Sequence, residues 1–285
     1  MVKRTGIFFH YQDGERLRDF PEALAGILSR DNVFLYDAYY PLKPPASYEL
    51  EPIAEEVLLE VHSADMISSI KNTAAFMGAL YSAAGTVAAA MRMGRQEIDN
   101  AFVFTGYGDH HAGSTFCGGG CYFNGAVMAI RQLRRHFATG RTAIVDTDAH
   151  HGDGTWELCR RDPETLYVCF CSGGSTNTNN NVNVRVPWRT SDEEYLNLVQ
   201  QEFVPLAEQF HPEFMFWNWG YDGTQGDYGD IGISPETHVH LARLLKQTAD
   251  RICDGRLIVV LCGGSRRDLA RYLIPQIVSV LAGAE

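Results

Sequence analysis

Short apolar runs alternate with longer amphipathic stretches along most of the chain. The apolar runs predict β-strands, and they are TGIFFH, NVFLYD, AFVFTG, TAIVDTD, LYVCF, FMFWNWG and LIVVLCGG. Apolar residues at helical spacing predict helices over residues 53–69, 76–93, 124–137, 192–210, 235–253 and 268–281. Several strands are apolar on both faces, as in a parallel sheet that helices cover on each side. The pattern therefore predicts a doubly wound α/β architecture.

Two segments lack both patterns and predict loops. Residues 39–52 contain four prolines, which interrupt regular structure. Residues 172–183 are polar and rich in glycine and asparagine. Since the sequence contains no internal repeat, low-complexity tract or Ser/Gly-rich linker, we expect a single domain over residues 1–285.

Charge and cysteine content narrow the function classes. The net charge of −11 argues against binding to a nucleic-acid backbone, which normally needs a basic surface. The seven cysteines lie mostly in apolar stretches, which indicates reduced thiols in a cytoplasmic protein. The apolar stretch near the N-terminus is too short for a secretory signal, and no run of about 18 apolar residues predicts a membrane span.

Chemically active residues follow three of the predicted strands directly. AFVFTG leads into YGDHHAG, TAIVDTD into AHHGDG, and FMFWNWG into YDGTQGD. Four of the ten histidines (His110, His111, His150 and His151) lie in the first two junctions. In parallel α/β sheets, ligands bind at the carboxyl ends of the strands. These junctions therefore predict a common site.

The segment IVDTDAHHGDGT predicts a metal site. Residues two apart on an extended segment point the same way, so Asp148 and His150 present a carboxylate and an imidazole to one point. Asp222, after another strand, supplies a third ligand. Zinc fits this donor set best, with Fe(II) and Mn(II) as alternatives. Three protein ligands with an open position are typical of a catalytic metal rather than a structural one.

The adjacent histidines His110 and His111 are not needed as ligands. Beside a metal-activated water they predict a general base and its electrostatic partner. Each imidazole then needs a carboxylate to orient its other nitrogen, and Asp146 and Asp153 serve this purpose. The alternative is that Asp146 only caps the loop and Asp153 belongs to an Asp-Gly turn.

These motifs carry a resemblance to a known family. DTDAHHGDGT resembles the Asp-x-Asp-x-His-His-Gly-x-Gly-Thr signature of the histone deacetylase family. GDHHAG, GGCYFN and WGYDG resemble further segments of that family in the same order, and the similarity to bacterial and archaeal members runs from end to end. The resemblance implies the arginase/deacetylase fold. This fold has three layers, with helices on both faces of a mostly parallel sheet of about eight strands.

The resemblance also implies roles for individual residues. The family's metal ligands are matched by Asp148, His150 and Asp222. Its histidine pair is matched by His110 and His111, the second of which is the general base and acid. Asp146 is similar to the partner of the first histidine and Asp153 to the partner of the second. His151 belongs to the signature but is not a ligand.

The chain departs from the family on the substrate side. Ser265, in LCGGSRRD, stands where the family has a tyrosine that donates to the developing oxyanion. A serine hydroxyl is too short to reach the same carbonyl, and losing one such donor typically costs about 10²–10³ in turnover. Arg266, Tyr221 or a group of the substrate could compensate.

The walls of the substrate tunnel also differ from the family pattern. Gly120 replaces one aromatic wall, and the polar loop 172–183 replaces the other, which predicts a wider and more polar tunnel. In addition, Cys169 replaces a serine of the family's monovalent cation site, so potassium binding is expected to be weakened.

These observations predict a zinc-dependent hydrolase that acts on a linear acyl amide. The substrate is an acyl-lysine peptide, an acylpolyamine or a small-molecule amide rather than plain histone acetyl-lysine. The alternative is a metal-bearing binding protein with little or no turnover, because of Ser265. An arginase-like hydrolase with two metals does not fit, since too few aspartates and histidines stand at these strand ends.

Overall fold

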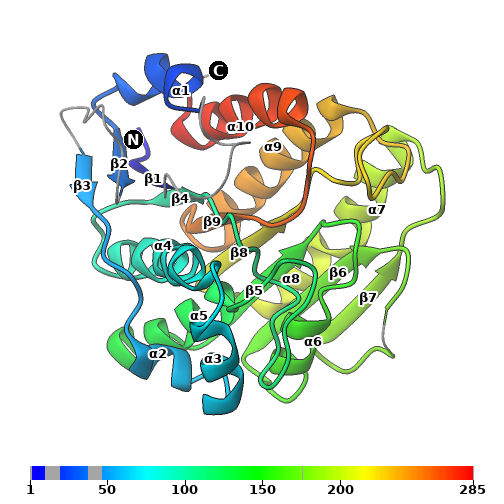
Figure 1. Cartoon of the computed structure of the whole chain (residues 1–285). Helices are drawn as coiled ribbons and strands as arrows, with labels where there is room; N and C mark the ends of the chain where they lie inside the picture. The colour runs from blue at the N-terminus through cyan, green and yellow to red at the C-terminus, as the bar shows by residue number, and fades with distance from the viewer. Residues whose placement is uncertain (1, 10–19, 38–46, 175, 285) are drawn as a thin grey trace.

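The computed structural model describes residues 2–9, 20–37, 47–174 and 176–284. Within these residues one sheet has the strand order β3-β2-β1-β4-β9-β8-β5-β6-β7, and all neighbouring strands run parallel (Figure 1). The strands are β1 (Thr5–Phe9), β2 (Val33–Asp37), β3 (Ser47–Glu49), β4 (Asn100–Val103), β5 (Thr142–Asp146), β6 (Thr165–Cys171), β7 (Asn181–Arg185), β8 (Phe214–Trp219) and β9 (Leu257–Leu261).

Helices cover both faces of this sheet. Those packed in one core are α1 (Phe20–Leu28), α7 (Asp192–Glu202), α8 (Val204–Phe210), α9 (Pro235–Ile252) and α10 (Arg267–Ala282). Those packed in the other core are α2 (Glu55–Leu59), α3 (Ala64–Lys71), α4 (Phe76–Gly94), α5 (Gly125–Phe137) and α6 (Asp153–Cys159). Helices on both faces of a parallel sheet give three layers, so the predicted α/β class is confirmed.

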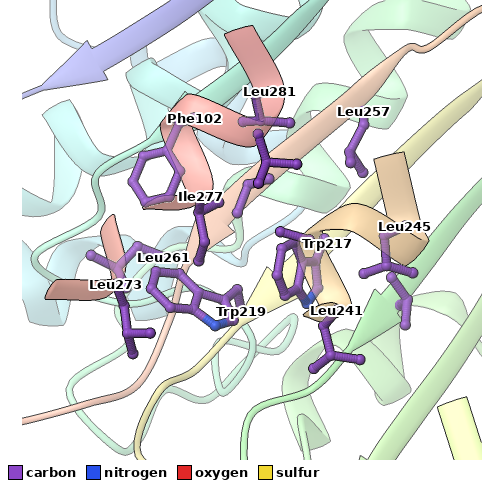
Figure 2. Close-up of a cluster of buried hydrophobic side chains, with 14 of the residues drawn as sticks. Phe102, Trp217, Trp219, Leu241, Leu245, Leu257, Leu261, Leu273, Ile277 and Leu281 are labelled. Carbon is purple, nitrogen blue, oxygen red and sulfur yellow. The ribbon is translucent and has the colours of Figure 1, made fainter. Parts of the chain in front are cut away.

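Two hydrophobic cores follow from the alternation of side chains along the strands. Ile7 and Phe9 enter one core, whereas Phe8 between them enters the other. Figure 2 shows the first core, where Phe102, Trp217 and Trp219 from the sheet meet leucine and isoleucine side chains of α9 and α10. Each large apolar side chain that is fully buried contributes about 1.5–3 kcal/mol to stability. Burial on both faces explains why these strands read as continuous apolar runs.

Two of the predicted helices are each divided in the structure. The stretch 53–69 forms α2 and α3, because Ser63 starts a new helix by accepting a hydrogen bond from the Met66 backbone N–H at 3.3 Å. The stretch 192–210 forms α7 and α8. Pro205 lies in the first turn of α8, where its missing N–H is tolerated but the preceding helix does not continue.

Four elements were not predicted from the sequence. Helices α1 and α6 are short, and the edge strands β3 and β7 fall within or overlap the two predicted loops. Strand β3 lies in the predicted loop 39–52, of which residues 39–46 are outside the described part. Strand β7 begins at Asn181 and pairs only with β6. Its alternating asparagine and valine give no apolar run, because an edge strand need not be buried on both faces.

The strand order places β4, β9, β8 and β5 side by side near the middle of the sheet. Because these strands are parallel, their carboxyl ends share one edge, and the predicted site residues all follow these ends. None of the described helices combines the length and apolar character of a membrane span.

Candidate metal centre and active site

Three of the predicted ligands meet at the carboxyl ends of β5 and β8. Asp148 and His150 follow β5, and Asp222 follows the neighbouring strand β8. The Nδ1 atom of His150 lies 3.1 Å from Asp148 Oδ1 and 2.8 Å from Asp222 Oδ2. One ligand atom from each of the three side chains lies within 4.8 Å of the others. The structure thus brings together all three predicted ligands.

Backbone N–H groups of the loop after β5 hold the carboxylates in place. The N–H of His150 donates to Asp148 Oδ1 at 2.9 Å, and the N–H of Ala149 donates to Asp222 Oδ1 at 3.2 Å. Glycines give the carboxylates room, because a Cβ atom at Gly220 or Gly263 would collide with Asp148 Oδ2. The backbone hydrogen bonds of the loop and the close packing of the carboxylates against the glycines therefore both direct these oxygens to one point.

One carboxylate oxygen of Asp148 has no hydrogen-bond partner among the described residues, which shows whether a metal ion would fit between these side chains. Asp148 Oδ2 is fully buried and accepts no hydrogen bond from any residue that the structure describes. Such an orphaned carboxylate oxygen is costly unless it is paired or coordinates a cation. Two carboxylates, one of which carries this oxygen, and one imidazole form a donor set that fits a divalent metal ion.

The electrostatics of the three side chains agree with a cation site. Hydrogen bonds to Asp148, and then to Asp222, raise the pKa of His150 to about 10. Burial, and then the negative charge of Asp148, raise the pKa of Asp222 to about 6. The two carboxylates thus place a negative potential at this point, which favours a cation.

The histidine pair lies beside this group, and each imidazole contacts one aspartate. His110 Nδ1 lies 3.0 Å from Asp146 Oδ2, and His111 Nδ1 lies 2.7 Å from Asp153 Oδ1. The two rings are 4.2 Å apart between centroids. Tyr167, which the sequence analysis did not single out, donates its hydroxyl to Asp146 Oδ2 at 2.8 Å. The structure thus pairs histidines and aspartates as the resemblance implies.

The two histidines differ in burial and charge. Burial alone would lower the pKa of His110, but the charges of Asp146 and Asp148 outweigh it and raise the pKa to about 10. Burial, and then the positive charge of His110, lower the pKa of His111. The lowered pKa favours the neutral form of His111, which can accept a proton, whereas the raised pKa favours the protonated form of His110.

A cavity of about 490 Å³ opens above these residues. His111, His150 and Tyr228 line it, together with Gly106, Gly108, Gly119, Gly120, Gly263 and Gly264. A Cβ atom at Gly120 would meet nothing within 4 Å, so the space beside this residue is open. None of the described residues of the loop 172–183 lines the cavity. A larger hollow of about 800 Å³ lies elsewhere, beside Arg141 and Arg160, and contains none of the predicted site residues.

Ser265 reaches the cavity wall, but its hydroxyl is engaged elsewhere. Ser265 Oγ donates to Asp227 Oδ1 at 2.5 Å, and its backbone N–H donates to the same carboxylate. The two side chains considered as replacements do not line this cavity. Arg266 forms an ion pair with Asp268, and Tyr221 is fully buried against Trp219 in the core.

His151 belongs to a different group from His150. Its Nδ1 atom lies 3.6 Å from Cys171 Sγ, which in turn lies 3.4 Å from Cys169 Sγ. The thiol expected at the position of the family's cation-binding serine is therefore in contact with another thiol. This histidine does not line the cavity.

Sequence comparison places this arrangement in a family. A family model of the histone deacetylase domain matches residues 27–281. The chain belongs to the histone deacetylase family. A probable deacetylase from Archaeoglobus fulgidus is 29% identical over 315 residues, with 98% of this chain and 86% of the relative covered. Histone deacetylase HDA1 of Candida albicans is 26% identical over 80% of this chain, which spans 29% of that relative's length.

A solved structure supports the fold of this histone deacetylase family protein. The HDA15 HD domain superposes with a TM-score of 0.80 and 21% sequence identity, covering 98% of this chain and 89% of that chain. The family and the arginase/deacetylase fold expected from the sequence are thus confirmed, with nine parallel strands in the described residues instead of about eight. Family membership implies an amide hydrolase. The family is typically metal-dependent, in agreement with the grouped metal-binding side chains.

Proposed function

We propose that this histone deacetylase family protein is a zinc-dependent hydrolase of linear acyl amides. The observation that carries the proposal is the convergence of Asp148, His150 and Asp222 within 4.8 Å, around an orphaned carboxylate oxygen. The same site holds a histidine pair whose aspartate contacts measure 3.0 and 2.7 Å. A ligand group, a proton-transfer pair and an open cavity are the parts that such a hydrolase needs.

The three ligands would hold Zn²⁺, with Fe²⁺ and Mn²⁺ as alternatives. A bound zinc ion lowers the pKa of its water toward about 7 and polarises a carbonyl group. Potassium binding beside it is a weaker expectation, because Cys169 replaces the expected serine and its Sγ lies 3.4 Å from Cys171 Sγ. A thiol is a poor ligand for a hard monovalent cation.

His111 carries out the proton transfers, and His110 assists it. With Nδ1 of His111 engaged by Asp153, Nε2 is the nitrogen that takes the proton of the attacking water. Asp146 fixes His110 in the same way, so the other nitrogen of this buried imidazole is oriented to donate a hydrogen bond toward the negative charge that develops on the amide. His111 then gives its proton to the departing amine, which leaves the carboxylate product.

The cavity supports a substrate other than plain histone acetyl-lysine. Six glycines line its walls, and the side next to Gly120 is open, so a bulky or branched group is accommodated. Acyl-lysine peptides, acylpolyamines and small-molecule amides all fit this description. The net charge of −11 suits a substrate whose amine is cationic.

A panel of acyl amides that varies the acyl group and the amine tests the proposal. We expect the zinc-loaded protein to hydrolyse at least one class, and Asp148→Ala and His150→Ala to remove this activity together with stoichiometric zinc. The matched control is Asp254→Asn, because the Asp254 side chain is 85% exposed and far from the site in the fold. Unchanged hydrolysis in both ligand variants would refute the assignment.

The environment of Ser265 supports a second candidate function, that of a binding protein. Because its hydroxyl is held by Asp227, the position that the family uses for an oxyanion donor has none, and a metal-bearing binding protein with little turnover is the alternative. Binding of acyl-hydroxamates to the zinc-loaded protein, measured by calorimetry, separates the two. Tight binding without turnover of any amide in the panel supports the binding protein.

A further inference from the structure

Tyr228 is the one tyrosine among the described residues that line the cavity. It lies in the loop after β8, six residues beyond Asp222. The residue is 61% exposed. Its ring stacks on the imidazole of His150, with centroids 5.4 Å apart and an angle of 27° between the planes.

The hydroxyl of Tyr228 lies close to the proposed metal ligands. Gly263 lies in the cavity wall and has no side chain. A Cβ atom at this residue would lie within 3.0 Å of three side-chain atoms. They are Asp148 Oδ2, Asp222 Cγ and Tyr228 Oη. The phenol oxygen therefore lies near the orphaned oxygen of Asp148, in the wall of the cavity that Tyr228 lines. An oxygen at this place would face the carbonyl of an amide bound beside the proposed ligands.

Backbone contacts hold this hydroxyl in position. The Gly264 N–H donates to Tyr228 Oη at 3.1 Å, and the Tyr228 N–H donates to Asp227 Oδ1 at 2.8 Å. The same Asp227 carboxylate accepts from Ser265. A phenol oxygen that accepts a hydrogen bond still carries its own proton and can donate it. The serine thus helps to fix the loop that carries the tyrosine.

We propose that Tyr228 donates its hydroxyl proton as a hydrogen bond to the amide carbonyl oxygen, and that it is a catalytic residue of this chain. The inference rests on the proposed hydrolase function and assigns the oxyanion donor that Ser265 does not supply. A preorganised donor of this kind is worth about 10²–10³ in turnover. The tyrosine comes from the loop after β8, whereas the serine follows β9.

The test compares Tyr228→Phe with Tyr272→Phe. Both remove one phenol oxygen, but Tyr272 lies on α10, is 43% exposed and donates to Glu236. On the best amide of the panel we expect Tyr228→Phe to lower kcat by about 10²–10³ with little change in KM. Tyr272→Phe should stay within twofold of the unchanged protein. Ser265→Ala should lose less than tenfold, since its hydroxyl acts only through Asp227.

Two readouts do not depend on turnover. Zinc content should be the same in Tyr228→Phe as in the unchanged protein, and its affinity for an acyl-hydroxamate should fall by about tenfold because the ligand's carbonyl loses a donor. Unchanged kcat in Tyr228→Phe, or loss of zinc from it, overturns the assignment. If the unchanged protein hydrolyses nothing in the panel, the proposed function fails instead, so the two failures are distinguishable.

An independent observation concerns the thiols near His151. Cys169 and Cys171 lie two residues apart on β6 and are fully buried, and their sulfur atoms are 3.4 Å apart. His151 Nδ1 lies 3.6 Å from Cys171 Sγ, and one ligand atom from each of the three residues falls within 4.8 Å of the others. Asn183 Oδ1 accepts a hydrogen bond from Cys171 Sγ at 3.2 Å and is thus an oxygen next to the thiols.

We infer that His151, Cys169 and Cys171 bind a thiophilic metal ion, separate from the ion at Asp148. Sulfur and imidazole nitrogen ligands select soft or borderline ions such as Cu(I), Zn(II) and Cd(II). Binding releases the two thiol protons, and the ion takes both thiolate electron pairs without any redox step. Residues 172–174, which follow Cys171 in the chain, are exposed.

Cadmium titration tests this site through the thiolate-to-metal absorption band. The carboxylate group of Asp148 and Asp222 contains no thiolate and gives no such band. We expect the band in the unchanged protein, its loss in Cys171→Ser, and a tenfold or greater loss of affinity in His151→Ala. Cys117→Ser is the matched control, because Cys117 is exposed and stands apart from the group. Absence of the band, or its loss in Cys117→Ser alone, overturns the inference.

Discussion

His150 and His151 are neighbours in the chain, yet they belong to two different groups of side chains. His150 contacts the carboxylates of Asp148 and Asp222, while His151 contacts the thiols of Cys169 and Cys171. The strand order explains the separation, because β5 lies between β8 and β6. One histidine meets the residues at the end of β8, and the next meets the residues of β6.

The two groups differ in the chemistry that they support. The carboxylate group has oxygen donors, includes an orphaned buried oxygen and lines the cavity, so a metal held there would be accessible to substrate. The thiol group has sulfur donors and does not line that cavity. Histidine is therefore grouped with oxygen donors in one place and with sulfur donors in the other, and the neighbouring strands decide which.

The largest expected effect comes from removing a carboxylate of the first group. Asp148→Asn keeps the shape of the side chain but removes its charge, and we expect it to lower hydrolysis by about 10³-fold or more, equal to about 4 kcal/mol. Zinc content, measured by atomic emission, should fall with activity. Metal removal by a chelator should have the same effect on the unchanged protein, with recovery when zinc is added. Full activity of the metal-free protein would rule out the metal mechanism.

The next effect concerns proton transfer beside the first group. His111→Ala removes the proposed base while all three ligands stay, so we expect a loss of about 10²–10⁴ in kcat. The zinc content should be unchanged, which separates this variant from Asp148→Asn. His136→Ala, in the last turn of α5, is a matched control of the same residue type. A His111 variant with normal kcat would show that another group takes the proton.

A smaller effect is expected from the partner of the base. Asp153 contacts His111 Nδ1 at 2.7 Å, so Asp153→Asn should mis-orient the imidazole and lower kcat about 10- to 100-fold. Zinc affinity should not change. If Asp153 belongs only to a turn at the start of α6, kcat stays normal and only the melting temperature changes.

The smallest effect on hydrolysis should come from the second group. His151→Ala should change kcat less than tenfold, because its imidazole contacts thiols rather than the cavity. The same variant should lose cadmium affinity, which His111→Ala should retain. A double comparison of hydrolysis and cadmium binding across both variants therefore separates the two groups. If His151→Ala stopped hydrolysis as completely as His111→Ala, the separation proposed here would be wrong.

Much of the fold was accessible from the sequence, for a clear physical reason. A sheet covered on both faces forces its inner strands to be apolar at every position, and the run LIVVL of β9 shows this directly. The edge strands β3 and β7 carry no such signal, because only one side is paired and their residues need not be apolar. The division of two long helices depended on local details, namely the cap at Ser63 and Pro205.

The site was accessible only in part. Motif and spacing selected Asp148, His150 and Asp222, and the structure groups them. Tyr228 was missed, although it directly follows the quoted segment YDGTQGD, because a tyrosine in a polar loop has no distinctive pattern. Only the contact with Gly264 and the stacking on His150 bring its hydroxyl to the cavity.

The sequence by itself determined the architecture, the family and the set of metal-binding side chains, because these follow from periodicity, residue type and order along the chain. The tertiary structure decided which groups meet. It sends His150 and His151 to opposite neighbours of β5, ties Ser265 to Asp227 and places Tyr228 beside Asp148. Such contacts join residues on different strands. They depend on strand order and loop conformation, which residue spacing along one chain does not encode.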